Sequence, residues 1–198
     1  MAGLARRLGG ILPHYAQIAW WGLVASRAGR RPLTVLQAVI RSERGVLLSV
    51  RSDLRGWELP GGNARAGESD RDALQREVWE ETGLEVAIER RVGDYVRTGF
   101  GPYTARIFAC RPVGPEGALR PSPETPVVRW FAPEAVPDTL FPWYRGPLAD
   151  ALADHPEPVL RRERQGLRWV LAGMVIDLRM RLSDDRAGLS GPGDGDAG

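Results

Sequence analysis

The sequence predicts an α/β fold in which a mixed β-sheet lies between helices, with a helical extension at each end of the chain. Three observations support this prediction. Segments with strand-like apolar patterns come in two groups, at residues 33–50 and 86–131, and a helical pattern follows each group. An apolar sheet needs cover on both faces, which two helices supply. Further apolar segments at residues 15–25 and 160–182 lie outside this alternation, so we place them in extensions.

The N-terminal extension is predicted to span residues 1–32. Residues 15–25 (YAQIAWWGLVA) are apolar and aromatic and are flanked by arginines. Pro13, His14 and the paired tryptophans make a poor signal peptide, and the segment is marginal in length for a membrane-spanning helix. We interpret it as a helix that packs on the domain, on the C-terminal helix or across a dimer. A membrane-surface helix and a signal or anchor segment are the alternatives.

The central domain is predicted to span residues 33–155. Strands are expected where β-branched or alternating apolar residues recur, at 33–40, 45–50, 85–95, 103–111 and 127–131. A turn at residues 98–102 and a long loop at 112–126 separate the later strands, because both are rich in glycine and proline. A second helix of the core is expected at residues 143–153.

The C-terminal extension is predicted as one helix within residues 156–183, beginning at Leu160. Its apolar residues form two stripes, Leu167, Leu171, Met174 and Leu178 in one and Trp169, Gly173, Ile176 and Met180 in the other. A helix that is apolar on two sides requires burial on both. Residues 184–198 are rich in glycine, aspartate and serine without periodicity, so we expect a disordered tail.

The most informative segment is residues 62–84, a glycine-rich turn followed by a short acidic helix. Ser69 is a favourable N-cap and Gly83 fits the position that ends a helix. Glu77, Glu80 and Glu81 share one helix face because they are three and four residues apart. Such a face is either solvated or binds a cation, and carboxylate oxygens are preferred ligands of Mg²⁺ and Mn²⁺.

This segment resembles the Nudix box. The spacing is Gly62, five residues, Glu68, seven residues, Arg76-Glu77-Val78, one residue, Glu80-Glu81, one residue, Gly83-Leu84, and all nine defined positions match. The preceding Trp57-Glu58-Leu59-Pro60-Gly61 is similar to the usual lead-in. The resemblance covers roughly residues 33–154. It implies the α/β/α sandwich of Nudix hydrolases and divalent-metal-dependent hydrolysis of a diphosphate linked to another group, X.

The resemblance also implies roles for the matched residues. The metal ligands it implies, for Mg²⁺ or Mn²⁺, are Glu77, Glu80 and Glu81, with the carbonyl of Gly62 assisting. Arg76 lies one turn before Glu80 and would hold that carboxylate in place. Glu68 would either contact the metal shell through water or brace the loop on the helix, and both roles stay open.

The general base and the substrate are less well defined. Some family members have a carboxylate just before the tryptophan of the strand that contains Trp130, but here Arg129 occupies that place. Glu124, six residues upstream of Trp130, is the nearest acid and is either a candidate base or loop surface. Aromatic residues that either stack on a base or pack in the core or a lid are Trp57, Phe100, Tyr103, Phe141, Trp143 and Tyr144.

Composition restricts the partners. The 27 cationic side chains are all arginine and are interspersed with 25 acids, so the formal net charge is +2. We therefore expect a nucleotide-type small-molecule substrate and no stable complex with nucleic acid, and a homodimer is open. The single cysteine, Cys110, excludes an intrachain disulfide and fits a cytoplasmic location.

The resemblance to the Nudix box implies a Nudix pyrophosphohydrolase acting on a nucleoside diphosphate derivative. One alternative is a non-catalytic nucleotide-binding or regulatory Nudix domain, in which the acids of the box are usually degraded. The other is a membrane-associated Nudix enzyme whose terminal helices contact lipid.

Overall fold

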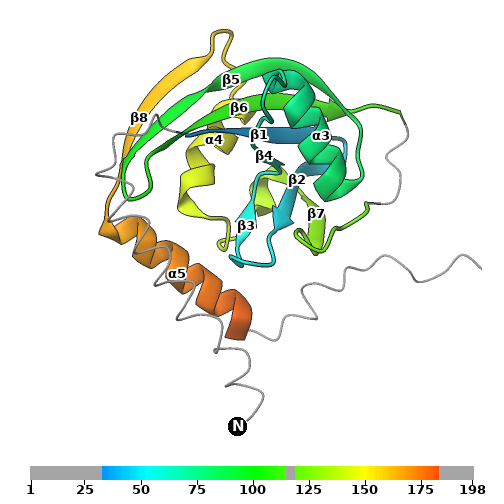
Figure 1. The fold of residues 1–198 in the computed structure, drawn as a ribbon. Coiled ribbons are helices and arrows are strands. Elements are labelled where there is room, and N and C mark those ends of the chain that lie inside the picture. Colours follow the sequence, from blue (N-terminus) through cyan, green and yellow to red (C-terminus); the bar gives the residue numbers. More distant parts are fainter. Residues whose placement is uncertain (1–32, 115–118, 183–198) are drawn as a thin grey trace, which may run out of the picture.

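The computed structural model describes residues 33–114 and 119–182, which form a single mixed sheet with helices on both faces (Figure 1). The strands are β1 (Leu33–Ser42), β2 (Gly45–Val50), β3 (Trp57–Glu58), β4 (Gly61–Gly62), β5 (Val86–Gly99), β6 (Tyr103–Pro112), β7 (Val127–Phe131) and β8 (Val159–Gln165). The helices are α3 (Asp70–Thr82), a 3-10 turn (Pro133–Ala135), α4 (Pro142–Leu152) and α5 (Leu167–Leu182). The predicted N-terminal helix and the predicted tail lie outside the described residues.

The sheet is open and has the strand order β3-β2-β1-β6-β5-β8, with β4 paired to β1 and β7 paired to β2. Its mixed character comes from two parallel pairs, β1 with β6 and β5 with β8, among otherwise antiparallel neighbours. The short strand β4 pairs with β1 through Gly61 and Gly62. This pairing holds the glycine turn of the box against the centre of the sheet.

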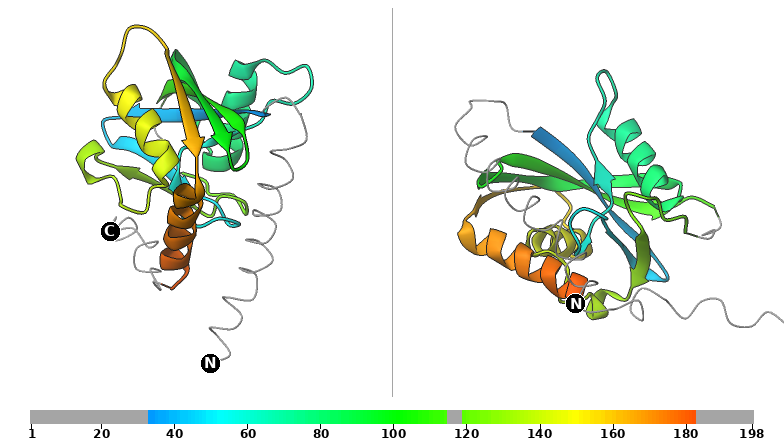
Figure 2. Two further views of the ribbon diagram at one scale, coloured as in Figure 1. Left: turned by 90° about the vertical axis from the view of Figure 1, so that its left-hand side faces the viewer. Right: turned by 60° about the horizontal axis from the view of Figure 1, so that its bottom comes forward.

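Two hydrophobic clusters cover the two faces of the sheet. Leu74 and Val78 of α3 belong to one cluster, and Tyr144 and Leu148 of α4 belong to the other. Figure 2 shows α3 on one side of the strands and α4 and α5 on the opposite side. The predicted α/β/α sandwich with a mixed sheet is confirmed.

The prediction of a helix from Leu160 is wrong for its first part, since residues 159–165 form the edge strand β8. This strand pairs in parallel with β5 from Gly93 to Gly99. Gly93 permits the approach, because a Cβ atom there would lie 2.3 Å from the carbonyl oxygen of Val159. Arginines and glutamate favour a helix when only local propensity counts, and the free edge of β5 overrides that preference. Helix α5 begins after Gly166.

Helix α5 buries one of its two predicted stripes. Gly173 and Ile176 are buried, whereas Leu167, Leu171 and Leu178 are exposed. The expectation that both stripes are buried is therefore not met within the described residues. Across residues 33–114 and 119–182, no helix is both long and apolar enough to cross a membrane.

Candidate active site

The acidic helix α3 begins and ends where the sequence predicts. The Ser69 hydroxyl accepts a hydrogen bond from the backbone N–H of Asp72 at 3.2 Å, which caps the first turn. Gly83 adopts a left-handed conformation with φ 74°, and its N–H donates to the carbonyl of Trp79 at 2.9 Å. The two caps fix the ends of the helix, and burial of Leu74 and Val78 fixes its rotation. Glu77 then lies against Gly62, and Glu81 accepts a hydrogen bond from Gly61.

Arg76 organises the acidic face. Its guanidinium donates to both carboxylate oxygens of Glu68 at 2.9 Å, to Glu77 at 2.8 Å and to Glu80 at 3.2 Å. It also donates to the carbonyl of Asn63 at 3.2 Å, which ties the loop to the helix. The predicted contact between Arg76 and Glu80 is present, together with contacts to two other acids of the box.

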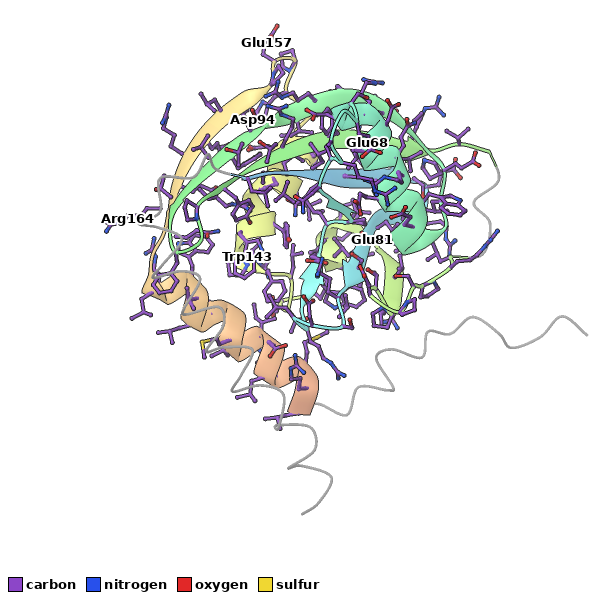
Figure 3. The ribbon with its side chains drawn as sticks, viewed as in Figure 1. Glu68, Glu81, Asp94, Trp143, Glu157 and Arg164 are labelled. Atoms are coloured by element: carbon purple, nitrogen blue, oxygen red, sulfur yellow. The ribbon has the colours of Figure 1, made fainter. Side chains whose placement is uncertain are left out.

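Glu68 occupies a bracing position. Besides Arg76, its carboxylate accepts a hydrogen bond from the backbone N–H of Arg65 at 2.9 Å. These hydrogen bonds, those from Arg76 first, lower the pKa of Glu68 to about 2. In Figure 3, Glu68 lies above Glu81, which belongs to the last turn of α3. Of the two roles left open, the geometry favours bracing of the loop.

Glu81 is the buried acid of the box, with 8% of its surface exposed. Its carboxylate accepts a hydrogen bond from the backbone N–H of Gly61 at 2.9 Å. Burial raises the pKa of Glu81 to about 7, and the charges of Glu77 and Glu124 act in the same direction. A carboxyl group with this pKa changes its charge near neutral pH, so a nearby cation would strongly favour its ionised form.

The glycine turn lies directly against Glu77. A Cβ atom at Gly62 would come within 2.5 Å of the Glu77 carboxylate carbon and 2.6 Å of one of its oxygens. A side chain at position 62 would therefore displace the Glu77 carboxylate, and the backbone of Gly62 adjoins the carboxylate with which it is predicted to share a metal.

The chemistry of these donors fits a hard divalent cation, because they are carboxylates and a backbone carbonyl. Among the described residues, however, no three His, Cys, Asp or Glu side chains are grouped as a metal site. Glu77 and Glu80 are instead engaged by Arg76, and Glu81 by Gly61. Mg²⁺ or Mn²⁺ would therefore compete with Arg76 for Glu77 and Glu80, and Glu80, whose side chain is 41% exposed, is the most accessible of the three acids.

A buried polar cluster next to the box was not predicted. Glu58 is buried between the box and α4 and accepts a hydrogen bond from the Tyr144 hydroxyl at 3.2 Å. Gln37 donates to the same hydroxyl at 3.0 Å, while its Oε1 is buried without a hydrogen-bond partner. Burial raises the pKa of Glu58 to about 8, against the opposing charge of Arg51. The sequence signal was an acid between two large apolar residues, Trp57 and Leu59, just before the glycine turn.

The raised pKa of Glu58 predicts a pH-dependent stability. The folded protein binds a proton at Glu58 up to about pH 8, whereas the unfolded chain loses it near pH 4.5. Stability therefore falls as the pH rises between these values, because the buried carboxylate must ionise. We expect Glu58→Gln to be more stable than wild type by about 4 kcal/mol at pH 8, and by less than about 1 kcal/mol at pH 5.

The measurement is chemical denaturation of both proteins across this pH range without added metal. The matched control is Glu85→Gln, which changes an exposed acid. A stability difference between Glu58→Gln and wild type that stays constant with pH would show that Glu58 is already ionised at pH 5.

Glu124 lies on the loop before β7 and is exposed. Its carbonyl accepts a hydrogen bond from the N–H of Ser52 at 2.8 Å, which holds the loop against the end of β2. Its charge contributes to the raised pKa of Glu81, so the fold brings Glu124 close to the box. Sequence separation alone could not establish this proximity.

The three aromatic residues predicted to contact the substrate lie in two separate places in the fold. Trp57 is buried and packs edge-on against Phe131, with 4.7 Å between ring centroids, and it lines a cavity of about 910 Å³. Phe100 and Tyr103 lie at the β5–β6 turn, where Tyr103 accepts a hydrogen bond from the buried Arg97. The structure does not bring these three residues into one pocket.

Comparison with known proteins agrees with this geometry. The family model described as NUDIX domain matches residues 30–152, which is more than half of the chain. A "MutT-like protein" of Streptomyces ambofaciens is 37% identical over 120 residues, covering 61% of this chain and 76% of the relative. A Bacillus subtilis protein with the provisional name 8-oxo-dGTP diphosphatase is 33% identical over 104 residues, covering 52% of this chain and 68% of the relative.

A solved structure is also similar. The ADP-ribose pyrophosphatase of Streptococcus suis has a TM-score of 0.56 and 27% identity, and the match covers 67% of this chain and 100% of that one. Strand β8 and helix α5 begin after the family match ends at residue 152. The complete box, the fold that presents it and these matches together establish that the chain belongs to the Nudix family and is a Nudix pyrophosphohydrolase.

Proposed function

We propose that the protein is a divalent-metal-dependent hydrolase that cleaves a phosphoanhydride bond in a nucleoside diphosphate linked to another group. The observation that carries the proposal is the placement of Glu77, Glu80 and Glu81 beside the Gly61–Gly62 turn, with Arg76 connecting the acids. Enzymatic phosphoryl chemistry depends on neutralising charge on phosphate oxygens and on positioning the attacking water.

In this proposal, Glu77, Glu80, Glu81 and the carbonyl of Gly62 hold Mg²⁺ or Mn²⁺. The bound cation supplies charge neutralisation and a more acidic water. The protein contributes positioning: Arg76 holds the acids and, through Glu68, fixes the loop on the helix. The Gly61 N–H orients Glu81, whose burial keeps this carboxylate in one place.

Glu124 is the candidate to accept a proton from the attacking water. It is exposed on a loop, its charge acts on Glu81, and it lies outside the set of implied metal ligands. We expect Glu124→Gln to lower kcat by about 10² with little change in metal affinity, since a positioned general base contributes about 10² to 10⁴.

Steady-state kinetics with a metal titration test this role. Glu134→Gln is the matched control, because Glu134 is also an exposed acid and lies in the 3-10 turn before α4. If Glu124→Gln keeps the kcat of wild type, Glu124 belongs to the loop surface and another group accepts the proton.

The substrate class rests on the names of similar proteins and on the acidic site. The relatives are named for action on 8-oxo-dGTP and ADP-ribose, which share a nucleoside joined to a phosphoanhydride. A panel of nucleoside di- and triphosphates including 8-oxo-dGTP, nucleotide sugars, ADP-ribose, dinucleoside polyphosphates and capped RNA, with product analysis, would identify X. Release of a nucleoside monophosphate or of phosphate from at least one of them is expected.

A non-catalytic regulatory domain is the alternative, and the intact box argues against it. All nine defined positions are present, including the three acids that such domains usually lose. The same panel separates the two functions: binding of nucleotides without turnover of any of them, in the presence of Mg²⁺ or Mn²⁺, would favour the regulatory role.

A further inference from the structure

Helix α5 has an apolar face that the described residues leave open. Five residues on this face recur at intervals of four, four, three and four and are between 38% and 63% exposed: Leu167, Leu171, Val175, Leu178 and Leu182. We call this set the outer stripe. Its spacing places all five side chains along one side of the helix. A continuous apolar face of this kind marks a contact surface.

The other side of α5 is already packed. Gly173 lies against Trp143, where a Cβ atom would come within 2.9 Å of the indole ring. Asp177 is fully buried and accepts a hydrogen bond from the backbone N–H of Arg55 at 2.7 Å. Arg181 donates both to Asp177 at 2.9 Å and to the carbonyl of Asp53 at 2.8 Å. These contacts fix the rotation of α5, so the helix cannot turn to bury the outer stripe in the core.

The strand register shows where the chain enters the sheet relative to α5. Leu33 pairs with Tyr103, Tyr103 with Arg97, and Arg97 with Glu163, so these four residues form one row across the sheet. Three steps between neighbouring strands amount to about 14 Å. Glu163 lies four residues before Leu167, the first residue of α5. The N-terminal end of β1 and the start of α5 therefore lie near the same end of the sheet.

We propose that residues 15–25 of the same chain cover the outer stripe, running antiparallel to α5. This segment is apolar along its length and is followed by residues 26–32, which span up to about 25 Å when extended. That reach brings Ala25 to the first turns of α5. The rest of the segment then extends toward Val175 and Leu178. Residues 15–25 are therefore an apolar segment that lies close enough along the chain to cover the outer stripe of α5.

The small number of residues in the outer stripe favours residues 15–25 over a second copy of the chain as the segment that covers it. A stable interface between proteins engages about 20 to 30 residues on each side. The outer stripe has five, which suits a single covering segment whose attachment to β1 raises its local concentration.

Paired cysteines test the proposal in the full chain. The native Cys110 is fully buried and its thiol pKa is raised to about 12, so it does not compete for reagent. We expect Leu23→Cys with Leu171→Cys, and Ile18→Cys with Leu178→Cys, to be joined by a short bismaleimide within one chain. The yield should exceed that of Leu23→Cys with Arg111→Cys by at least about 10-fold. Arg111 is exposed and lies eight residues beyond Tyr103 along β6, about 27 Å away.

Three results would overturn the proposal. One is a product of dimer mass, also formed when the two single-cysteine variants are mixed, which identifies a second copy as the occupant. Another is co-sedimentation with anionic vesicles without any crosslink, which identifies a membrane surface. The third is hydrogen exchange of residues 15–25 at the rate of an unstructured peptide.

Hydrogen exchange is measured on the wild-type chain, so it tests the proposal even if the cysteine variants fold poorly. We expect the amides of residues 15–25 to exchange at least about 100-fold more slowly than in an unstructured peptide.

Discussion

Glu80→Gln and Glu81→Gln should each lower kcat by about 10² to 10⁴ while the protein still folds, the scale on which a major electrostatic or acid–base contribution is lost. Glutamine keeps the shape of the side chain and removes the charge that binds a hard cation. Glu77, Glu80 and Glu81 share the helix face beside the glycine turn, so removing one charge weakens the whole ligand set.

The two substitutions should be tolerated by the fold for different reasons. Glu81 is buried, and its Gly61 hydrogen bond can be kept by the amide oxygen of glutamine, so Glu81→Gln removes a buried ionisable group without losing that contact. Glu80 is more exposed and contacts Arg76 at 3.2 Å and Arg65 at 3.3 Å, which are surface ion pairs of small value. Neither variant should unfold the protein.

Circular dichroism and kinetics with a metal titration are the measurements, and Glu85→Gln is the control, because Glu85 is exposed just beyond the end of α3. A near-wild-type kcat for both Glu80→Gln and Glu81→Gln would rule out the site proposed here.

The elements that sequence alone predicted depend on local chemistry. Helix α3 begins at the Ser69 cap and ends at Gly83, because capping is decided within one turn of the chain. The contact of Arg76 with Glu80 follows from their spacing of four residues on one helix. The two-sided cover of the sheet followed from the order of strands and helices.

What the sequence did not predict depends on contacts between distant segments. Residues 159–165 form a strand because the edge of β5, about 66 positions earlier, accepts them at Gly93 and Gly99. The partnership of Glu58 with Tyr144 joins residues 86 positions apart, and that of Gln37 with Tyr144 joins residues 107 apart. Propensity and periodicity carry no information on such pairs, so the buried polar cluster became visible only in the fold.

Removal of divalent metal should abolish activity altogether. The acidic face would bring several carboxylates to an anionic substrate, and their charges repel phosphate unless a cation lies between them. Arg76 does not replace that cation, since its guanidinium is already bound to Glu68, Glu77 and Glu80. Restoring Mg²⁺ or Mn²⁺ should restore turnover, because the fold and caps of α3 do not depend on the metal.

Product release from the substrate panel, followed with added Mg²⁺ or Mn²⁺ and then with excess EDTA, tests metal-dependent phosphoanhydride hydrolysis most directly. We expect a nucleoside monophosphate or phosphate to be released from at least one substrate with metal, no release with chelator, and recovery when metal is added back. Full activity in excess EDTA on every substrate that is cleaved would contradict the assignment of the acidic face of α3 as a metal-dependent active site.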